Sequence, residues 1–107
     1  IAGGDAKKQN LLPLKGSIKN NVKALILIGR DAHVFMENFK DIDCIEIAIC
    51  ESMKEAVTKA YSLANQGEVV LLSPASASLD MYSNYIERGN HFKEIVHQII
   101  LYLFPLF

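Results

Sequence analysis

The amino-acid sequence predicts an α/β fold in three layers, with a mostly parallel sheet between two layers of helices. Apolar runs of strand length alternate along the chain with segments whose apolar residues recur every three or four positions. Strands that alternate with helices are joined most economically as a parallel sheet of Rossmann-like type. The chain has 107 residues, the length of one domain, so we expect a single domain over 1–107.

Four stretches are expected to form strands. Residues 22–28 read VKALILI, an almost continuous apolar run before Gly29, as in a strand covered on both faces. The alternating pattern of 43–50, DCIEIAIC, predicts a half-exposed or edge strand. The run VVLL at 69–72 predicts a further buried strand, and 1–2 resembles the end of another.

Three helices are expected from a period of 3.6 residues. Asp31 is an N-cap type of residue before the first, and Ser52 and Glu55 have the spacing of a capping box before the second. We expect Gly89 to end a short helix in a left-handed conformation and Asn90 to cap the last long one. The predicted buried faces are Ala32, Phe35, Met36 and Phe39; Met53, Ala56, Val57, Ala60, Tyr61 and Ala64; and Phe92, Ile95, Val96, Ile99, Ile100 and Leu103.

Composition argues against several classes of function. The formal net charge is −1, so no basic face for nucleic acid is expected. The apolar tail IILYLFPLF is shorter than the roughly 20 residues of a membrane-spanning helix, and Pro105 interrupts it. Cys44 and Cys50 form no CxxC pair and are expected to be free thiols in a reducing cytosol. The three histidines, His33, His91 and His97, are scattered on helical segments and are interpreted as surface or packing residues.

Three loops are expected at the carboxyl ends of the strands, where parallel sheets collect ligands. They comprise residues 3–8, 29–31 and 73–80. The last, SPASASLD, has small side chains that let a ligand approach the backbone, and N–H groups at a helix start can bind a carboxylate or phosphate. A purely structural interpretation stays open, in which Ser78 and its polar neighbours only cap a helix and Lys7 is solvated.

Several motifs together resemble one family. They are AGGDAKK at 2–8, LIGRDA at 27–32 and LLSPASASLDMY at 71–82, which continues into ERGN at 87–90. The chain is similar in these motifs to the C-terminal domain of the UDP-N-acetylmuramoyl-L-alanine:D-glutamate ligases, a branch of the Mur ligase family. The resemblance covers nearly the whole chain, and the third motif is its specific part.

The resemblance implies roles for individual residues in binding D-glutamate. Lys7 matches a family lysine that binds a glutamate carboxylate, and Ser78 and Leu79 match the serine and leucine of the same substrate site. Tyr85 stands where the family has a phenylalanine whose backbone helps to hold the side-chain carboxylate. Asp5 is expected to orient groups near Lys7. No catalytic or metal-binding residue is expected in this chain.

The resemblance further implies an ATP-dependent amide ligase of peptidoglycan synthesis, monomeric and located in the bacterial cytoplasm. It would join D-glutamate to UDP-MurNAc-L-alanine, with ATP and Mg²⁺ bound mainly by a domain outside this chain. Nothing like the family's DSKATN loop precedes Ile1, so we expect the first strand and helix of the family domain to be missing and the isolated chain to be inactive. The alternative is a free-standing α/β regulatory module that binds an anion or nucleotide.

Overall fold

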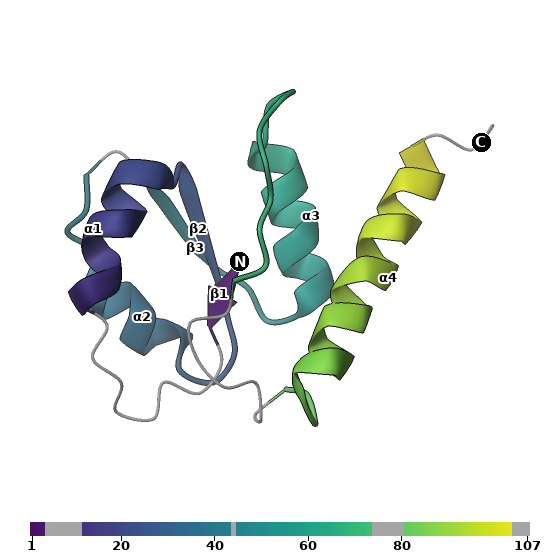
Figure 1. Ribbon diagram of the computed structural model, residues 1–107, viewed down its shortest axis with the longest axis horizontal. Helices are drawn as coiled ribbons and strands as arrows, with labels where there is room; N and C mark the ends of the chain where they lie inside the picture. Colours follow the sequence, from purple (N-terminus) through teal and green to yellow (C-terminus); the bar gives the residue numbers. More distant parts are fainter. Residues whose placement is uncertain (4–11, 44, 74–80, 104–107) are drawn as a thin grey trace.

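The computed structural model describes residues 1–3, 12–43, 45–73 and 81–103. A parallel three-stranded sheet in the order β1-β2-β3 lies between helices on both of its faces (Figure 1), which confirms the predicted α/β class and its three layers. The elements are β1 (Ala2–Gly3), α1 (Leu12–Asn21), β2 (Ala24–Ile28), α2 (Ala32–Phe39), β3 (Glu46–Ile49), α3 (Met53–Leu63) and α4 (Tyr85–Leu103).

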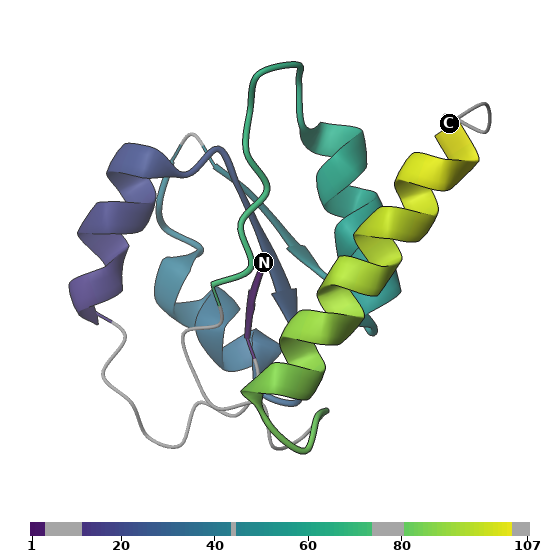
Figure 2. The same cartoon turned by 45° about the vertical axis from the view of Figure 1, so that its right-hand side comes forward.

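The central strand β2 divides the core into two clusters. Side chains of a strand point alternately to opposite faces of the sheet. Leu25 and Leu27 accordingly join the cluster around α2, whereas Ile26 and Ile28 join the cluster around α3 and α4. All four are buried, and this explains why the run is apolar at every position rather than at every second one. Helices α1 and α2 cover one face, and α3 and α4 cover the other (Figure 2).

The predictions for β2, β3 and two helices are confirmed. β3 pairs only with β2 among the described strands, and its residues are exposed or half-buried, as an edge strand requires. Helix α2 begins directly after Asp31, although the Asp31 side chain makes no capping hydrogen bond. At α3 the capping interaction forms, because the Glu55 backbone N–H donates to Ser52 Oγ at 3.1 Å.

The prediction of a buried strand at 69–72 is wrong. These residues have no strand assignment, and the exposed fraction reaches 84% at Val69 and 66% at Leu71. The segment runs beside the chain start, where the Ile1 amino group donates to Leu71 O at 2.6 Å and the Ser73 N–H donates to Ile1 O at 3.0 Å. These two contacts hold the segment beside the chain start, but the high exposure of Val69 and Leu71 is not that of a buried strand.

The predicted break at Gly89 and the predicted cap at Asn90 are also wrong. α4 runs without interruption from Tyr85 to Leu103, and Gly89 is not among the described glycines with a positive φ. Its cap is Asn84, whose Oδ1 accepts the Glu87 N–H at 2.8 Å. A glycine inside a helix costs about 1 kcal/mol relative to alanine, which the long apolar face of α4 outweighs.

The buried faces were predicted correctly except at their margins, and the predicted Leu103 side chain lies outside the described part of the chain. Ile95 is buried, and Phe92, Val96 and Ile99 pack against the same cluster, but Ile100 is 49% exposed. On α3 the predicted face is right as far as Ala60, after which Tyr61 points outward at 54% exposure. Within the described ranges, no helix combines the length and the hydropathy that crossing a membrane would take.

Candidate functional site at the carboxyl edge of the sheet

The three strands end at one edge of the sheet. Since they are parallel, and Gly3 pairs with Ile28 while Leu27 pairs with Ile49, the segments that follow each strand leave from the same side. Helix α4 begins on this side as well (Figure 1). This is the edge at which open parallel sheets bind their ligands.

Both small-residue loops start from neighbouring positions on this edge. The residues 4–11 follow Gly3, and 74–80 follow Ser73. The two hydrogen bonds of Ile1 with Leu71 and Ser73 have the pattern of a parallel pair, so the segment 71–73 runs in the same direction as β1. The points of departure of the two loops are therefore adjacent.

Four of the five predicted site residues lie outside the described residues. These are Asp5 and Lys7 in the first loop and Ser78 and Leu79 in the second, so their assignments stay predictions. The fifth, Tyr85, is the first residue of α4 and is 73% exposed. Its backbone N–H belongs to the first helical turn, where N–H groups have no partner within the helix.

Gly3 lies very close to the neighbouring strand β2. Its φ is +132°, and a Cβ at this position would lie 1.9 Å from the carbonyl oxygen of Ile28. Only glycine accepts both this backbone conformation and this approach. Gly3, the first glycine of the AGGD motif, thus has a steric role at the base of the loop.

The turn at 29–31 connects β2 to α2. Gly29 has a φ of 95°, and its carbonyl oxygen accepts the Ala32 N–H at 3.2 Å. Asp31 O accepts the N–H groups of Val34 and Phe35, which closes the first turn of the helix. These contacts give the GRD segment a structural function in starting α2.

Sequence reasoning missed the polar arrangement at the start of α4. Asn84 and Glu87 have the N-x-x-E spacing that is typical of a helix start. This pattern would have predicted that Asn84 caps α4. It also missed a contact between Tyr82 and His91, whose Oη and Nδ1 lie 2.7 Å apart. No local pattern announces that contact, because it depends on how the chain turns between the two residues.

Cys50 lies where β3 leads into α3. It is a buried free thiol, as predicted, and burial raises its pKa above the ordinary value of 9.0, with Glu55 adding to the effect. Cys44 lies outside the described residues. A thiol with a raised pKa is a poor nucleophile, so Cys50 contributes packing to this edge.

The family resemblance implies that Mg²⁺ is bound mainly by a domain outside this chain. Within the described ranges 1–3, 12–43, 45–73 and 81–103, no three His, Cys, Asp or Glu side chains are grouped as metal ligands.

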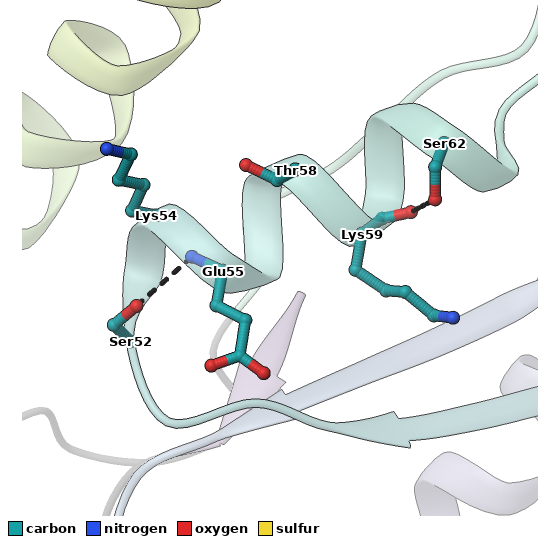
Figure 3. Close-up of a pocket in the computed structure, with 6 residues that line it drawn as sticks. All are labelled: Ser52, Lys54, Glu55, Thr58, Lys59 and Ser62. Carbon is teal, nitrogen blue, oxygen red and sulfur yellow. Dashed lines mark hydrogen bonds between the residues drawn. The ribbon is translucent and has the colours of Figure 1, made fainter.

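One surface pocket runs along α3 from the start of the helix. Figure 3 shows the six residues that line it, and all of them come from α3 or its cap. Two of its polar groups are engaged locally, since Ser52 caps the helix and Ser62 Oγ donates to Lys59 O at 2.7 Å. Because one helix alone provides the lining, no loops converge on this pocket. The lining residues are Ser52, Lys54, Glu55, Thr58, Lys59 and Ser62.

Fold and edge together define a class: a Rossmann-like α/β module whose candidate site is formed by the loops that follow its parallel strands. Sequence comparison places the chain more narrowly. It is 46% identical over 99 residues, 92% of its length, to the UDP-N-acetylmuramoylalanine–D-glutamate ligase of Coxiella burnetii. The chain is thus a relative of these ligases, which confirms the resemblance inferred from its motifs.

Two further relatives have the same name. The ligase of Alkaliphilus oremlandii is 44% identical over 96 residues, and that of Methylobacillus flagellatus is 42% identical over 96 residues. Each match covers 90% of this chain. The chain spans only about a fifth of these relatives, 21% or 22% of their length. No family profile matches the chain.

Proposed function

We propose that this chain is the C-terminal domain of an ATP-dependent ligase that adds D-glutamate to UDP-MurNAc-L-alanine. The observation that carries the proposal is the identity of 46% with a D-glutamate ligase over 92% of the chain. The match to about a fifth of the relative suits one domain of a larger enzyme. The proposal includes ATP and Mg²⁺ as cofactors held by the rest of that enzyme, which would be a monomer in the bacterial cytoplasm.

The proposed task of this domain is to hold D-glutamate. The substrate carries two carboxylates, so it needs cationic or hydrogen-bonding groups at two points, and its amine must be aimed at the activated carbonyl carbon. We assign one carboxylate to the Lys7 ammonium and the other to the Ser78 hydroxyl with backbone N–H groups. The assignment is supported by the adjacent positions of Gly3 and Ser73, after which the two loops begin, and by the start of α4 on the same side of the sheet.

Holding both ends of the substrate accelerates amide formation by orientation. When the amine of D-glutamate is held beside the activated carbonyl carbon, the two groups no longer have to find each other in solution. This removes much of the entropic barrier to amide formation. Leu79 would pack against the carbon chain of the substrate, the Tyr85 backbone N–H would face its side-chain carboxylate, and Asp5 would orient Lys7. We propose no chemical step for this chain alone.

The test uses the complete ligase that contains this segment. We expect Lys7→Ala and Ser78→Ala to raise the KM for D-glutamate at least about tenfold, the loss expected for a charge-assisted hydrogen bond, and to leave the KM for ATP within about twofold. Lys54→Ala is the matched control, because Lys54 is an exposed lysine of α3 that is not among the residues assigned to D-glutamate. Equal increases in both KM values would contradict the role in binding D-glutamate.

A second measurement tests whether the isolated chain binds D-glutamate without the rest of the ligase. Chemical-shift mapping on the 107-residue chain should show perturbation by D-glutamate and much weaker perturbation by L-glutamate. ATP hydrolysis that depends on D-glutamate in the isolated chain would overturn the proposal that it only positions a substrate.

A further inference from the structure

Tyr82 is a buried phenol whose hydroxyl reaches one exposed side chain. Tyr82 is 8% exposed and belongs to the same hydrophobic cluster as Ile28, Cys50 and Met53, at the carboxyl edge of the sheet. The phenol oxygen lies 2.7 Å from Nδ1 of His91, and the two rings are tilted by 60° with centroids 5.6 Å apart. The aromatic ring is thus fixed by the core while its polar end is fixed by α4.

The contact bridges the start of α4. Tyr82 precedes the helix, Asn84 caps it, and His91 lies in its second turn, so the pair closes a loop around the first turn. Tyr85, the one described residue of the proposed D-glutamate site, lies inside this loop. Burial raises the pKa of Tyr82 above its ordinary value of 10.0, with Glu87 adding to the effect, so the hydroxyl keeps its proton at neutral pH.

We propose that Tyr82 and His91 are positioning residues for the dicarboxylate substrate. The hydrogen bond between Tyr82 Oη and His91 Nδ1 fixes the first turn of α4, with the Tyr85 backbone N–H, relative to the sheet edge. The inference rests on the proposed function, because it concerns how the same site recognises D-glutamate. Neither side chain needs to touch the substrate.

Packing of the apolar cluster alone does not require the hydrogen bond between Tyr82 and His91. A phenylalanine at position 82 would fill the same apolar cluster without a buried hydroxyl that has to be satisfied. With tyrosine, the hydroxyl requires a partner, and His91 of α4 provides it at 2.7 Å. The hydrogen bond therefore specifies the orientation of the helix start, which apolar contacts alone specify less sharply.

The test compares variants of the complete ligase that separate the hydrogen bond from the packing. Tyr82→Phe keeps the ring and removes the hydroxyl, and His91→Leu removes the hydrogen-bond partner of that hydroxyl. His91→Asn restores a hydrogen-bonding group near the position of Nδ1. We expect the first two to raise the KM for D-glutamate about fivefold, the factor that corresponds to a typical net hydrogen bond, with the KM for ATP and kcat within about twofold. His91→Asn should recover most of the loss.

The double variant Tyr82→Phe/His91→Leu should show the same increase as either single variant, because both changes remove one interaction. His97→Leu is the control, an exposed histidine further along α4 that should leave both KM values unchanged. Thermal unfolding of each variant shows whether it is folded.

The outcomes distinguish this inference from the proposed function. A lower Tm with an unchanged KM for D-glutamate would make the pair purely structural and would overturn the inference alone. Additive effects in the double variant would overturn the pairing. A wild-type enzyme without D-glutamate-dependent ATP hydrolysis would overturn the proposed function, and the inference with it.

Discussion

Lys23 and Glu68 are 45 residues apart in the sequence, yet Nζ of the lysine lies 2.7 Å from Oε1 of the glutamate. The same ammonium donates to the carbonyl oxygen of Leu63, the last residue of α3, at 3.0 Å. Glu68 Oε1 also accepts the Asn65 N–H at 2.6 Å. One lysine before β2 therefore fixes the turn that leads away from α3.

Lys23→Met should consequently loosen this turn. The methionine retains the length of the side chain but leaves the Leu63 carbonyl and the Glu68 carboxylate without their cation. We expect a small decrease in Tm and faster hydrogen exchange at residues 64–68, whereas Lys54→Met should change neither. Unchanged exchange at 64–68 would show that the turn does not depend on Lys23.

The contribution of Glu68 should depend on pH in a defined direction. Hydrogen bonding to Lys23 and to the Asn65 N–H lowers the pKa of Glu68 below its ordinary value of 4.5. A carboxyl group with a lowered pKa stabilises the fold above its ordinary pKa and loses that effect as the pH falls through the lowered value. The stability difference between wild type and Glu68→Gln should therefore be constant near neutral pH and shrink in acid, as measured by urea unfolding at several pH values. A difference that grows in acid would contradict this assignment.

Gly3 and Gly16 should respond to alanine with opposite signs. Gly3→Ala combines a strained backbone conformation with a clash at 1.9 Å against the Ile28 carbonyl, so we expect a loss of about 1–3 kcal/mol or more. Gly16 lies in α1 with no atom within 4 Å of its virtual Cβ. Gly16→Ala should therefore gain about 0.5–1 kcal/mol through helix propensity. Chemical denaturation of the two variants checks both values, and a loss at Gly16 would disagree with the assignment of α1.

The two asparagines near the start of α4 should also differ. Asn84→Ala removes the cap and should cost about 1 kcal/mol, whereas Asn90→Ala replaces an exposed residue inside the helix and should be neutral or slightly stabilising. Equilibrium unfolding of both variants decides between one helix that begins at Asn84 and two helices that meet at Asn90. A larger loss at Asn90 would favour the second arrangement.

Cys50 should be protected from thiol reagents. In a Cys44→Ser background, we expect labelling of Cys50 in the native state to be at least about tenfold slower than in denaturant, because the thiol is buried and its pKa is raised. An acid with a raised pKa stabilises the fold below its ordinary pKa and loses that effect as the pH rises through the raised value. Unfolding should therefore become easier above about pH 9, and labelling should accelerate with it. Equal labelling rates in native and denatured chains would contradict the burial of Cys50.

Several elements could be predicted because short stretches of sequence specify them. The run ALILI at 24–28 has no polar residue to place on a solvent face, so it had to be a central strand. The spacing of Ser52 and Glu55 specifies a helix start through two backbone contacts within one turn. Helix α1 escaped prediction because its residues include a proline, a glycine and two asparagines, and none of them is buried.

The candidate site was predictable only where a motif stands for it. The resemblance supplied Lys7, Ser78, Leu79 and Tyr85, but no periodicity or spacing identifies a residue that binds glutamate. Tyr82 ends the motif LLSPASASLDMY, but the motif does not identify His91 as its partner, since their contact depends on the turn at 83–84 and on the start of α4. Predicting a cap at Asn90 hid this contact, because it placed His91 on a separate helix.

By itself the sequence determined the α/β class, the central strand, the helix starts at Ala32 and Met53, and the relationship to D-glutamate ligases, because each depends on residues close together or on motifs. Only the tertiary structure decided that 69–72 is not a strand, that α4 is continuous, and that Tyr82 meets His91. The reason is the same in all three cases. Strand pairing, helix continuation past a glycine and side-chain partners are settled by the free energy of contacts between distant segments, which local propensity does not contain.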